Sequence, residues 1–316
     1  MKLNIVTGKQ LRAQRVCFYG VESVGKTTLA AQAESPIFLD VENGTSHLDV
    51  PRIAVKTWGA LIDAVRALAT DEYNQFKTVV LDSIDWAERL CIEDLKAEKK
   101  IKSLEEIPYG KGFTMASERM ARFLNELDHL IDVGRHVVLV GHAQVKRVEP
   151  PDQVQAYDRY ELKLIKQTGP LVKEWVDHLF FLNFKTRVVE SESGKAKGRG
   201  GKDRVVLTSH TAAYDAKTRS ELAEELPLAW ESVAPIFGKV AAPAKPVAVE
   251  ILGREHKETK EALGTYLEPH EADVNAWLLS KRKITKGQTW RDMPPVMMTQ
   301  VEQRPEDFLR AVAAAA

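Results

Sequence analysis

One short stretch near the start of the chain has the residue types and the spacing to hold a phosphate chain. It reads Gly-x-x-x-x-Gly-Lys-Thr, and it lies between an apolar run at 16–19 and a run of helix formers at 28–33. Two glycines let the backbone curl until successive N–H groups converge on a phosphate at the positive end of the helix dipole. The lysine then reaches the β- and γ-phosphates, and the next hydroxyl binds Mg²⁺. We therefore predict that ATP and Mg²⁺ are bound here, by Gly20, Val21, Glu22, Ser23, Val24, Gly25, Lys26, Thr27 and Thr28.

Acidic residues follow the next two apolar runs. Asp82 ends the run 78–81 and has the form of the acid that holds Mg²⁺ through coordinated water. Glu42 ends the run 37–41, where a carboxylate could orient the water that attacks the γ-phosphate. Asp40, two residues earlier on the same side of the strand, is a rival base. Because strands often end in acids for turn formation, both carboxylates could instead be solvated turn residues.

Further polar residues could complete such a site. His142 and Gln144 follow the third apolar run, 136–140, where a polar group could sense ATP against ADP. Lys217 and Arg219 could reach a neighbouring subunit's nucleotide and stabilise transition-state charge. Ordinary loop polarity and solvated surface charge are the alternative readings of these two pairs.

Apolar runs alternate along the chain with segments whose apolar residues have helical spacing, and this order predicts the architecture. Helices are expected over 58–68 and 86–96, and from Met120 to a stop at Gly134. Strands that alternate with helices form βαβ units, so we expect a mainly parallel sheet with its ligand at the strand carboxyl ends. Segment 46–53 and most of 145–167 are expected to be irregular. Later elements are expected as strands at 179–189 and 204–209, a Gly- and Lys-rich hairpin tip between them, and a closing helix at 228–237.

The chain divides by composition. Residues 1–237 carry all the motifs above, 238–250 form an Ala/Pro-rich linker, and 251–316 are expected to be a small, mainly helical module. Val274, Trp277 and Leu278 would form the apolar face of that module. A tethered module of this kind could dock a partner, such as a single-strand-binding protein.

Charge and cysteine content limit the function further. The 45 Lys and Arg balance the 45 Asp and Glu, so contact with a polyanion must be local. Cys17 and Cys91 are the sole cysteines, which argues against a disulfide framework or a zinc site and fits a reducing compartment. No apolar run reaches eighteen residues and none resembles a secretion signal. We expect a cytoplasmic protein without a membrane span.

Two local clusters combine cations with an aromatic or flexible neighbour. Tyr109 with Lys111, and Lys146 with Arg147, have the chemistry of a groove for single-stranded DNA. The tip of the predicted hairpin is a weaker candidate for the same contact, through Lys195, Lys197, Arg199 and Lys202. A solvated charged face is the alternative in each case.

The motifs taken together resemble a known family. Segments 20–28, 38–42, 79–83 and 137–144 follow in the order and approximate spacing of the RecA-like core, and the chain resembles the short RecA-like ATPases of bacteriophages that act in single-strand annealing or recombination. The resemblance covers 16–237 and implies an α/β, RecA-like P-loop NTPase core with a mainly parallel central sheet.

The resemblance also implies roles for particular residues. Glu42 takes the place of the catalytic glutamate, Asp82 that of the Mg²⁺ acid, and His142 falls near the glutamine that couples the γ-phosphate to DNA. Segments 105–112 and 145–159 match the two DNA-facing loops by position. Residues 217–219 resemble the Lys-x-Arg element that reaches across protomers.

The sequence thus predicts a Mg²⁺-dependent ATPase that self-associates, as a ring or filament, with ATP between subunits. It is expected to bind single-stranded DNA for annealing or strand exchange. One rival is a nucleotide-gated adaptor or loader of a replication or packaging assembly that does not touch DNA. A second rival, a small-molecule kinase, is disfavoured because the chain has no Arg-rich lid.

Overall fold

The computed structural model describes residues 12–149, 155–190 and 196–238, and in the C-terminal part 263–264, 267–281, 283–284, 288–293, 301 and 305–313. Contacts between Cα atoms divide the chain into two compact units, 1–243 and 244–316. The expected linker falls almost wholly outside the described residues, as does Lys195 of the expected hairpin tip.

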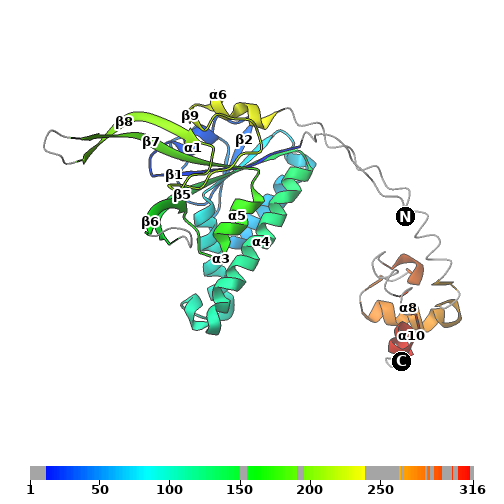
Figure 1. The fold of residues 1–316 in the computed structure, drawn as a ribbon. Helices are drawn as coiled ribbons and strands as arrows, with labels where there is room; N and C mark the ends of the chain where they lie inside the picture. Colours follow the sequence, from blue (N-terminus) through cyan, green and yellow to red (C-terminus); the bar gives the residue numbers. More distant parts are fainter. Residues whose placement is uncertain are drawn as a thin grey trace. The chain divides into compact units, whose positions relative to one another are not determined.

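A twisted sheet forms the centre of the first unit (Figure 1). Its described strands run in the order β3-β2-β4-β5-β1-β7-β8-β9, and β6 pairs with β5. The pairs from β3 to β7 are parallel, whereas β5–β6, β7–β8 and β8–β9 are antiparallel. The expected α/β fold with a mainly parallel sheet is therefore confirmed. The strands are β1 Arg15–Gly20, β2 Pro36–Asp40, β3 Arg52–Ala54, β4 Thr78–Asp82, β5 His136–Val148, β6 Tyr157–Leu162, β7 His178–Glu190, β8 Ala196–Leu207 and β9 Glu225–Pro227.

Helices cover both faces of this sheet (Figure 1). The side chains of β1 alternate between two buried clusters: Cys17 and Tyr19 pack in the cluster of α2, α3 and α4, and Val16 and Phe18 in that of α1 and α6. A strand buried on both faces is a continuous apolar run, which is why these strands could be predicted. The helices are α1 Lys26–Ala30, α2 Trp58–Leu68, α3 Ile84–Lys99, α4 Lys111–Asp132, α5 Thr168–Trp175 and α6 Trp230–Val233.

Two segments expected to be irregular are folded. Strand β5 continues to Val148 and pairs antiparallel with β6, so most of 145–162 is a hairpin. Within 46–53, the strand β3 begins at Arg52 and pairs with β2. The two unpredicted strands, β6 and β3, lack an alternation of apolar residues and are defined by backbone hydrogen bonds to a neighbouring strand. The pattern of their own side chains therefore could not predict them.

The segment before α4, which matches a DNA-facing loop by position, has regular structure. It forms two short 3-10 turns, η2 Leu104–Glu106 and η3 Pro108–Gly110. The Ser103 and Glu106 side chains cap the first turn reciprocally. A Cβ atom added to Gly112 would lie 2.3 Å from the Leu104 carbonyl oxygen, so the second turn and the start of α4 pack tightly against the first.

The second unit has a core of its own. Its described helices are α8 Glu271–Ser280 and α10 Pro305–Ala313, with 3-10 turns η5 Glu268–His270 and η6 Trp290–Asp292. Val274 and Leu278 of α8 are buried with Trp290, and Trp277 packs edge-on against Phe308 with ring centroids 5.2 Å apart. None of the helices described in either unit combines the length and the apolar character needed to cross a membrane.

Candidate nucleotide-binding site

The predicted phosphate loop connects the end of β1 to the start of α1. Gly25 lies in the left-handed region with φ 105°, a conformation that favours glycine, and Ser23 with φ 58° is also left-handed. Gly20 is needed for a different reason: a Cβ atom there would lie 2.1 Å from the Leu182 carbonyl oxygen of β7. One glycine therefore allows the loop to turn, and the other allows the neighbouring strand to approach.

Lys26 is buried at the start of α1 and points back across the loop. Its Nζ atom donates to the Val21 carbonyl oxygen at 2.9 Å and to that of Gly20 at 3.2 Å. Burial lowers the pKa of Lys26 below its ordinary value, although Asp82 and Asp85 oppose the shift. The ammonium is held by neutral carbonyl groups, which a phosphate oxygen would outcompete by charge.

Thr27 and Asp82 meet although 55 residues separate them. The Thr27 hydroxyl donates to Asp82 Oδ2 at 2.7 Å. Burial raises the pKa of Asp82 to about 6, and the hydrogen bond from Thr27 works against that rise. A hydroxyl and a carboxylate are hard oxygen donors of the kind Mg²⁺ prefers. This pair would hold the ion, Thr27 through its hydroxyl and Asp82 through coordinated water.

The structure separates the two candidate bases after β2. Asp40 is buried in the turn that follows: its carboxylate accepts from the N–H groups of Gly44 at 3.1 Å and Thr45 at 3.2 Å, and from the Thr45 hydroxyl at 2.5 Å. The contacts of the Glu42 carboxylate are long, at 3.4 Å to the Ser83 hydroxyl and 3.9 Å to His142, and its side chain is 32% exposed. Of the two carboxylates, Glu42 is the one free to meet a ligand.

His142 forms a tight pair with an acid that sequence reasoning did not identify. Its Nδ1 atom lies 3.0 Å from Asp85 Oδ2, and its backbone N–H donates to Asp85 Oδ1 at 3.2 Å. The hydrogen bond to Asp85 raises the pKa of His142 above its ordinary value, against the effect of burial. Its other ring nitrogen, Nε2, lies 3.9 Å from Glu42 Oε2. His142 therefore connects a buried acid of α3 to the candidate base.

The site residues share one cavity of about 370 Å³ at the carboxyl ends of the strands. A second cavity, of about 510 Å³, is also lined by Glu42 and His142 and contains Gln144 and Asp85. Gln144 thus lines the second cavity, where its amide donates to the Leu162 carbonyl oxygen at 3.4 Å. The first cavity is lined by Ser23, Gly25, Lys26, Thr27, Thr28, Glu42, Gly44, His47, Asp82, Val140 and His142.

Sequence reasoning missed His47, which lines the first cavity, and Asp85, which lines the second. His47 lies within the turn 45–48 and carries no motif. Asp85 did carry a signal, because it lies three residues before Glu88 and therefore on the same face of α3. Both acids are buried, and acids on a buried helix face need a polar partner.

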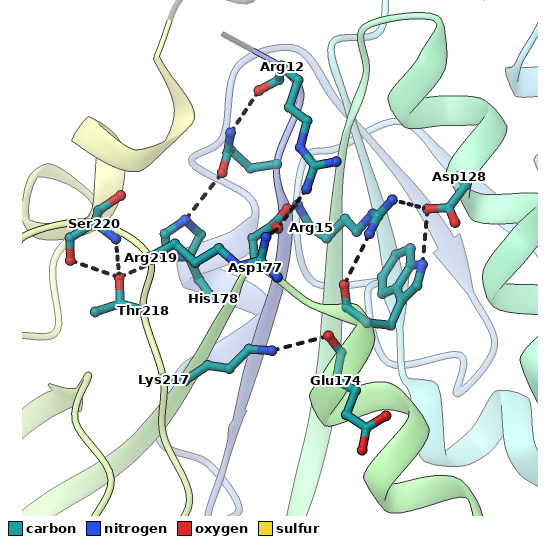
Figure 2. Close-up of polar contacts among 12 residues, drawn as sticks. Arg12, Arg15, Asp128, Glu174, Asp177, His178, Lys217, Thr218, Arg219 and Ser220 are labelled. Carbon is teal, nitrogen blue, oxygen red and sulfur yellow. Dashed lines mark hydrogen bonds and ion pairs between the residues drawn. The ribbon is translucent and has the colours of Figure 1, made fainter. Parts of the chain in front are cut away.

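Figure 2 shows Lys217 and Arg219 among residues near the start of β1 and β7, which is the end of these strands opposite the phosphate loop. Lys217 pairs with Leu179 at the start of β7, and its Nζ atom donates to the carbonyl oxygens of Lys173 and Glu174. Arg219 reaches the buried Asp177 at 3.2 Å. The six residues of β1 separate this end from the phosphate loop by roughly 17 Å. Neither cation can reach the loop of its own subunit.

The candidate DNA-binding residues lie on two separate elements. Tyr109 is 96% exposed in η3, and the exposed Lys111 begins α4. Lys146 and Arg147 are exposed in the part of β5 that pairs with β6, and Lys146 contacts Glu161 at 3.3 Å. That part of β5 continues directly from His142. Of the weaker candidates, Lys202 is exposed in β8.

A protein-family model described as an AAA domain matches residues 12–220, more than half of the chain. The crystal structure of the RadB recombinase shares 13% identity over 71% of this chain and 91% of that chain, with a TM-score of 0.39. That of the flagellar accessory protein FlaH from Methanocaldococcus jannaschii shares 9% identity over 69% and 85%, with a TM-score of 0.35. No curated protein matches the chain. From the family match, the chain belongs to the family described as an AAA domain, with its phosphate loop in an α/β fold whose central sheet is mainly parallel.

Proposed function

We propose that the protein is a Mg²⁺-dependent ATPase that binds single-stranded DNA and promotes annealing or strand exchange, as in phage recombination. The observation that carries the proposal is the single cavity into which Lys26, Thr27 and Glu42 open. These groups are the parts that ATP hydrolysis needs: a cation for the phosphates, a ligand for the metal ion and a carboxylate for water.

Each side chain has a role that follows from its present contacts. Lys26 leaves the carbonyl groups of its own loop and binds phosphate oxygens. Thr27 and Asp82 hold Mg²⁺, which supplies positive charge to the phosphoryl group when bound. Glu42, partly exposed and weakly bonded, orients water and accepts its proton.

His142 is proposed to report nucleotide occupancy. It lies 3.9 Å from Glu42 and is held by the buried Asp85, so a change around Glu42 reaches the imidazole directly. The strand then leads from His142 to Lys146 in four residues, roughly 13 Å. A shift of β5 at the nucleotide would therefore move the β5–β6 hairpin. We propose that Gln144 lies on this path and that the hairpin contacts DNA.

Assembly with ATP between subunits is proposed from the position of two cations. Lys217 and Arg219 cannot reach the loop of their own subunit, and the Arg219 side chain is 63% exposed. Only a second copy could bring them to a nucleotide. Sedimentation with and without a non-hydrolysable ATP analogue tests this assembly.

Two further proposals concern a partner and the compartment. The unit 244–316 is proposed to dock a partner such as a single-strand-binding protein. The buried free cysteines Cys17 and Cys91 suit a reducing cytoplasm.

The test of DNA binding measures affinity for single-stranded DNA at several salt concentrations, in the wild type and in the double variant Lys146→Ala/Arg147→Ala. Loss of two phosphate contacts should make the negative slope of log K against log salt less steep, by about 1.4. Arg66→Ala/Lys77→Ala is the control, because it removes two exposed cations elsewhere on the same unit. ATP turnover is measured with and without DNA.

The outcomes separate the rival functions. A wild type that hydrolyses ATP but neither binds DNA nor responds to it would support the adaptor and refute the DNA-binding proposal. An equal loss of affinity in the variant and the control would mean that binding does not depend on the β5–β6 hairpin.

A further inference from the structure

An arginine outside all the predicted site residues contacts the phosphate loop. Arg204 lies in β8, and its Nη1 atom donates to the Val24 carbonyl oxygen at 3.2 Å. The same Nη1 atom lies 2.7 Å from the position that a Cβ atom on Gly25 would take. The guanidinium therefore contacts the two residues that directly precede Lys26.

The backbone around Arg204 is held from both sides. Arg204 pairs with Phe184 of β7, and its carbonyl oxygen accepts from the Leu228 N–H at 3.0 Å. These two contacts fix the backbone of Arg204, and with it the base of the side chain, close to the phosphate loop.

The strand pairing changes at the same point. Phe184 pairs with Arg204, but the next pair is Thr186 with Gly200, so residues 201–203 of β8 lie opposite Lys185 alone. Such irregularities bend a strand and redirect its side chains, and they are frequent beside functional sites. Here the irregularity lies directly before the arginine that reaches the loop.

The charge of Arg204 is not neutralised by a neighbour. Among the described residues, no carboxylate forms an ion pair with its guanidinium, whose hydrogen bond goes to the neutral Val24 carbonyl group. Lys185, on the adjacent strand, instead pairs with Glu225 at 2.5 Å. A positive charge beside the loop favours an anion within it.

We propose that Arg204 is a positioning residue for the phosphate loop. By holding the Val24 carbonyl group, it keeps Gly25 in its left-handed conformation and the N–H groups of the loop free for phosphate. The inference rests on the proposed nucleotide binding and deepens it, because it adds a cation supplied by the antiparallel edge of the same subunit's sheet.

Binding and turnover of ATP test the inference in Arg204→Ala, Arg204→Gln and Arg204→Lys. We expect Arg204→Ala to weaken binding of a fluorescent ATP analogue about tenfold, which corresponds to about 1.4 kcal/mol. KM for ATP should rise by a similar factor while kcat stays within about twofold of the wild-type value. The reason is that Arg204 contacts the loop that binds ATP and does not take part in the chemical step. Arg204→Lys, which keeps the charge, should recover part of the affinity, and Arg204→Gln less. Lys185→Ala is the matched control and should bind as the wild type does.

Several results would overturn the inference. Unchanged affinity in Arg204→Ala would exclude a role in positioning, and a fall in kcat at constant KM would assign Arg204 to the chemical step instead. If all three variants lost the same affinity and also melted at the same lowered temperature, the role of Arg204 would be purely structural. A wild type that binds no nucleotide would refute the proposed function itself, and this inference with it. Normal wild-type binding with a normal Arg204→Ala would refute the inference alone.

Discussion

The two acids near the end of β2 should respond to amide substitution in opposite ways. In Asp40→Asn, an amide NH₂ group must face one of the donors that the carboxylate now accepts from, on Gly44 or Thr45. At least one charge-assisted hydrogen bond is lost and a buried donor is left unpaired, which costs about 2–4 kcal/mol. The corresponding fall in melting temperature is about 5–12 °C for a unit of this size.

Glu42→Gln should leave the fold intact and slow the reaction. The contacts of Glu42 with Ser83 and His142 are 3.4 and 3.9 Å long, so their loss changes stability by less than about 1 kcal/mol. Without a general base, ATP hydrolysis should fall by about 10²- to 10⁴-fold while ATP affinity changes little.

The assay is phosphate release at saturating ATP and Mg²⁺, with a thermal melt of each variant. The reasoning fails if Asp40→Asn melts as the wild type does and yet loses hydrolysis. It also fails if Glu42→Gln hydrolyses ATP at the wild-type rate, because the base would then lie elsewhere.

Two further substitutions test the phosphate loop and the helix α3. Lys26→Ala removes the ammonium that would bind phosphate and should weaken ATP binding by at least about 100-fold. The melting curve followed by circular dichroism should change little. Wild-type turnover in this variant would refute the site. Burial raises the pKa of Glu88 to about 7 from an ordinary 4.5, so the folded state binds this proton more tightly than the unfolded state. The contribution to stability is therefore full below about pH 4.5 and is lost, by up to about 3 kcal/mol, as the pH rises through 7. Urea unfolding at pH 5 and pH 8 should show a smaller loss for Glu88→Gln than for the wild type, and equal losses would show that Glu88 is ionised throughout.

The sequence by itself determined the elements whose residues carry a local pattern. The phosphate loop was readable because its glycines and Lys26 must stand at set distances along the chain to fold around phosphate. The helix over 58–68 was predicted with the bounds of α2, since its apolar positions repeat with the helical period. The end of β4 at Asp82 was predictable because the apolar run 78–81 stops there, whereas β2 ends at Asp40, two residues before the predicted end at Glu42.

The tertiary structure decided which of these residues meet. Asp40 and Glu42 look alike in sequence, and only the turn at Thr45 buries one and leaves the other open. Arg204 reaches a loop 180 residues earlier in the chain, and β6 forms by pairing with β5 and by a bridge to Tyr214. These contacts depend on strand order and register, which the periodicity of a single segment does not encode, because each segment must find its partner among all the others.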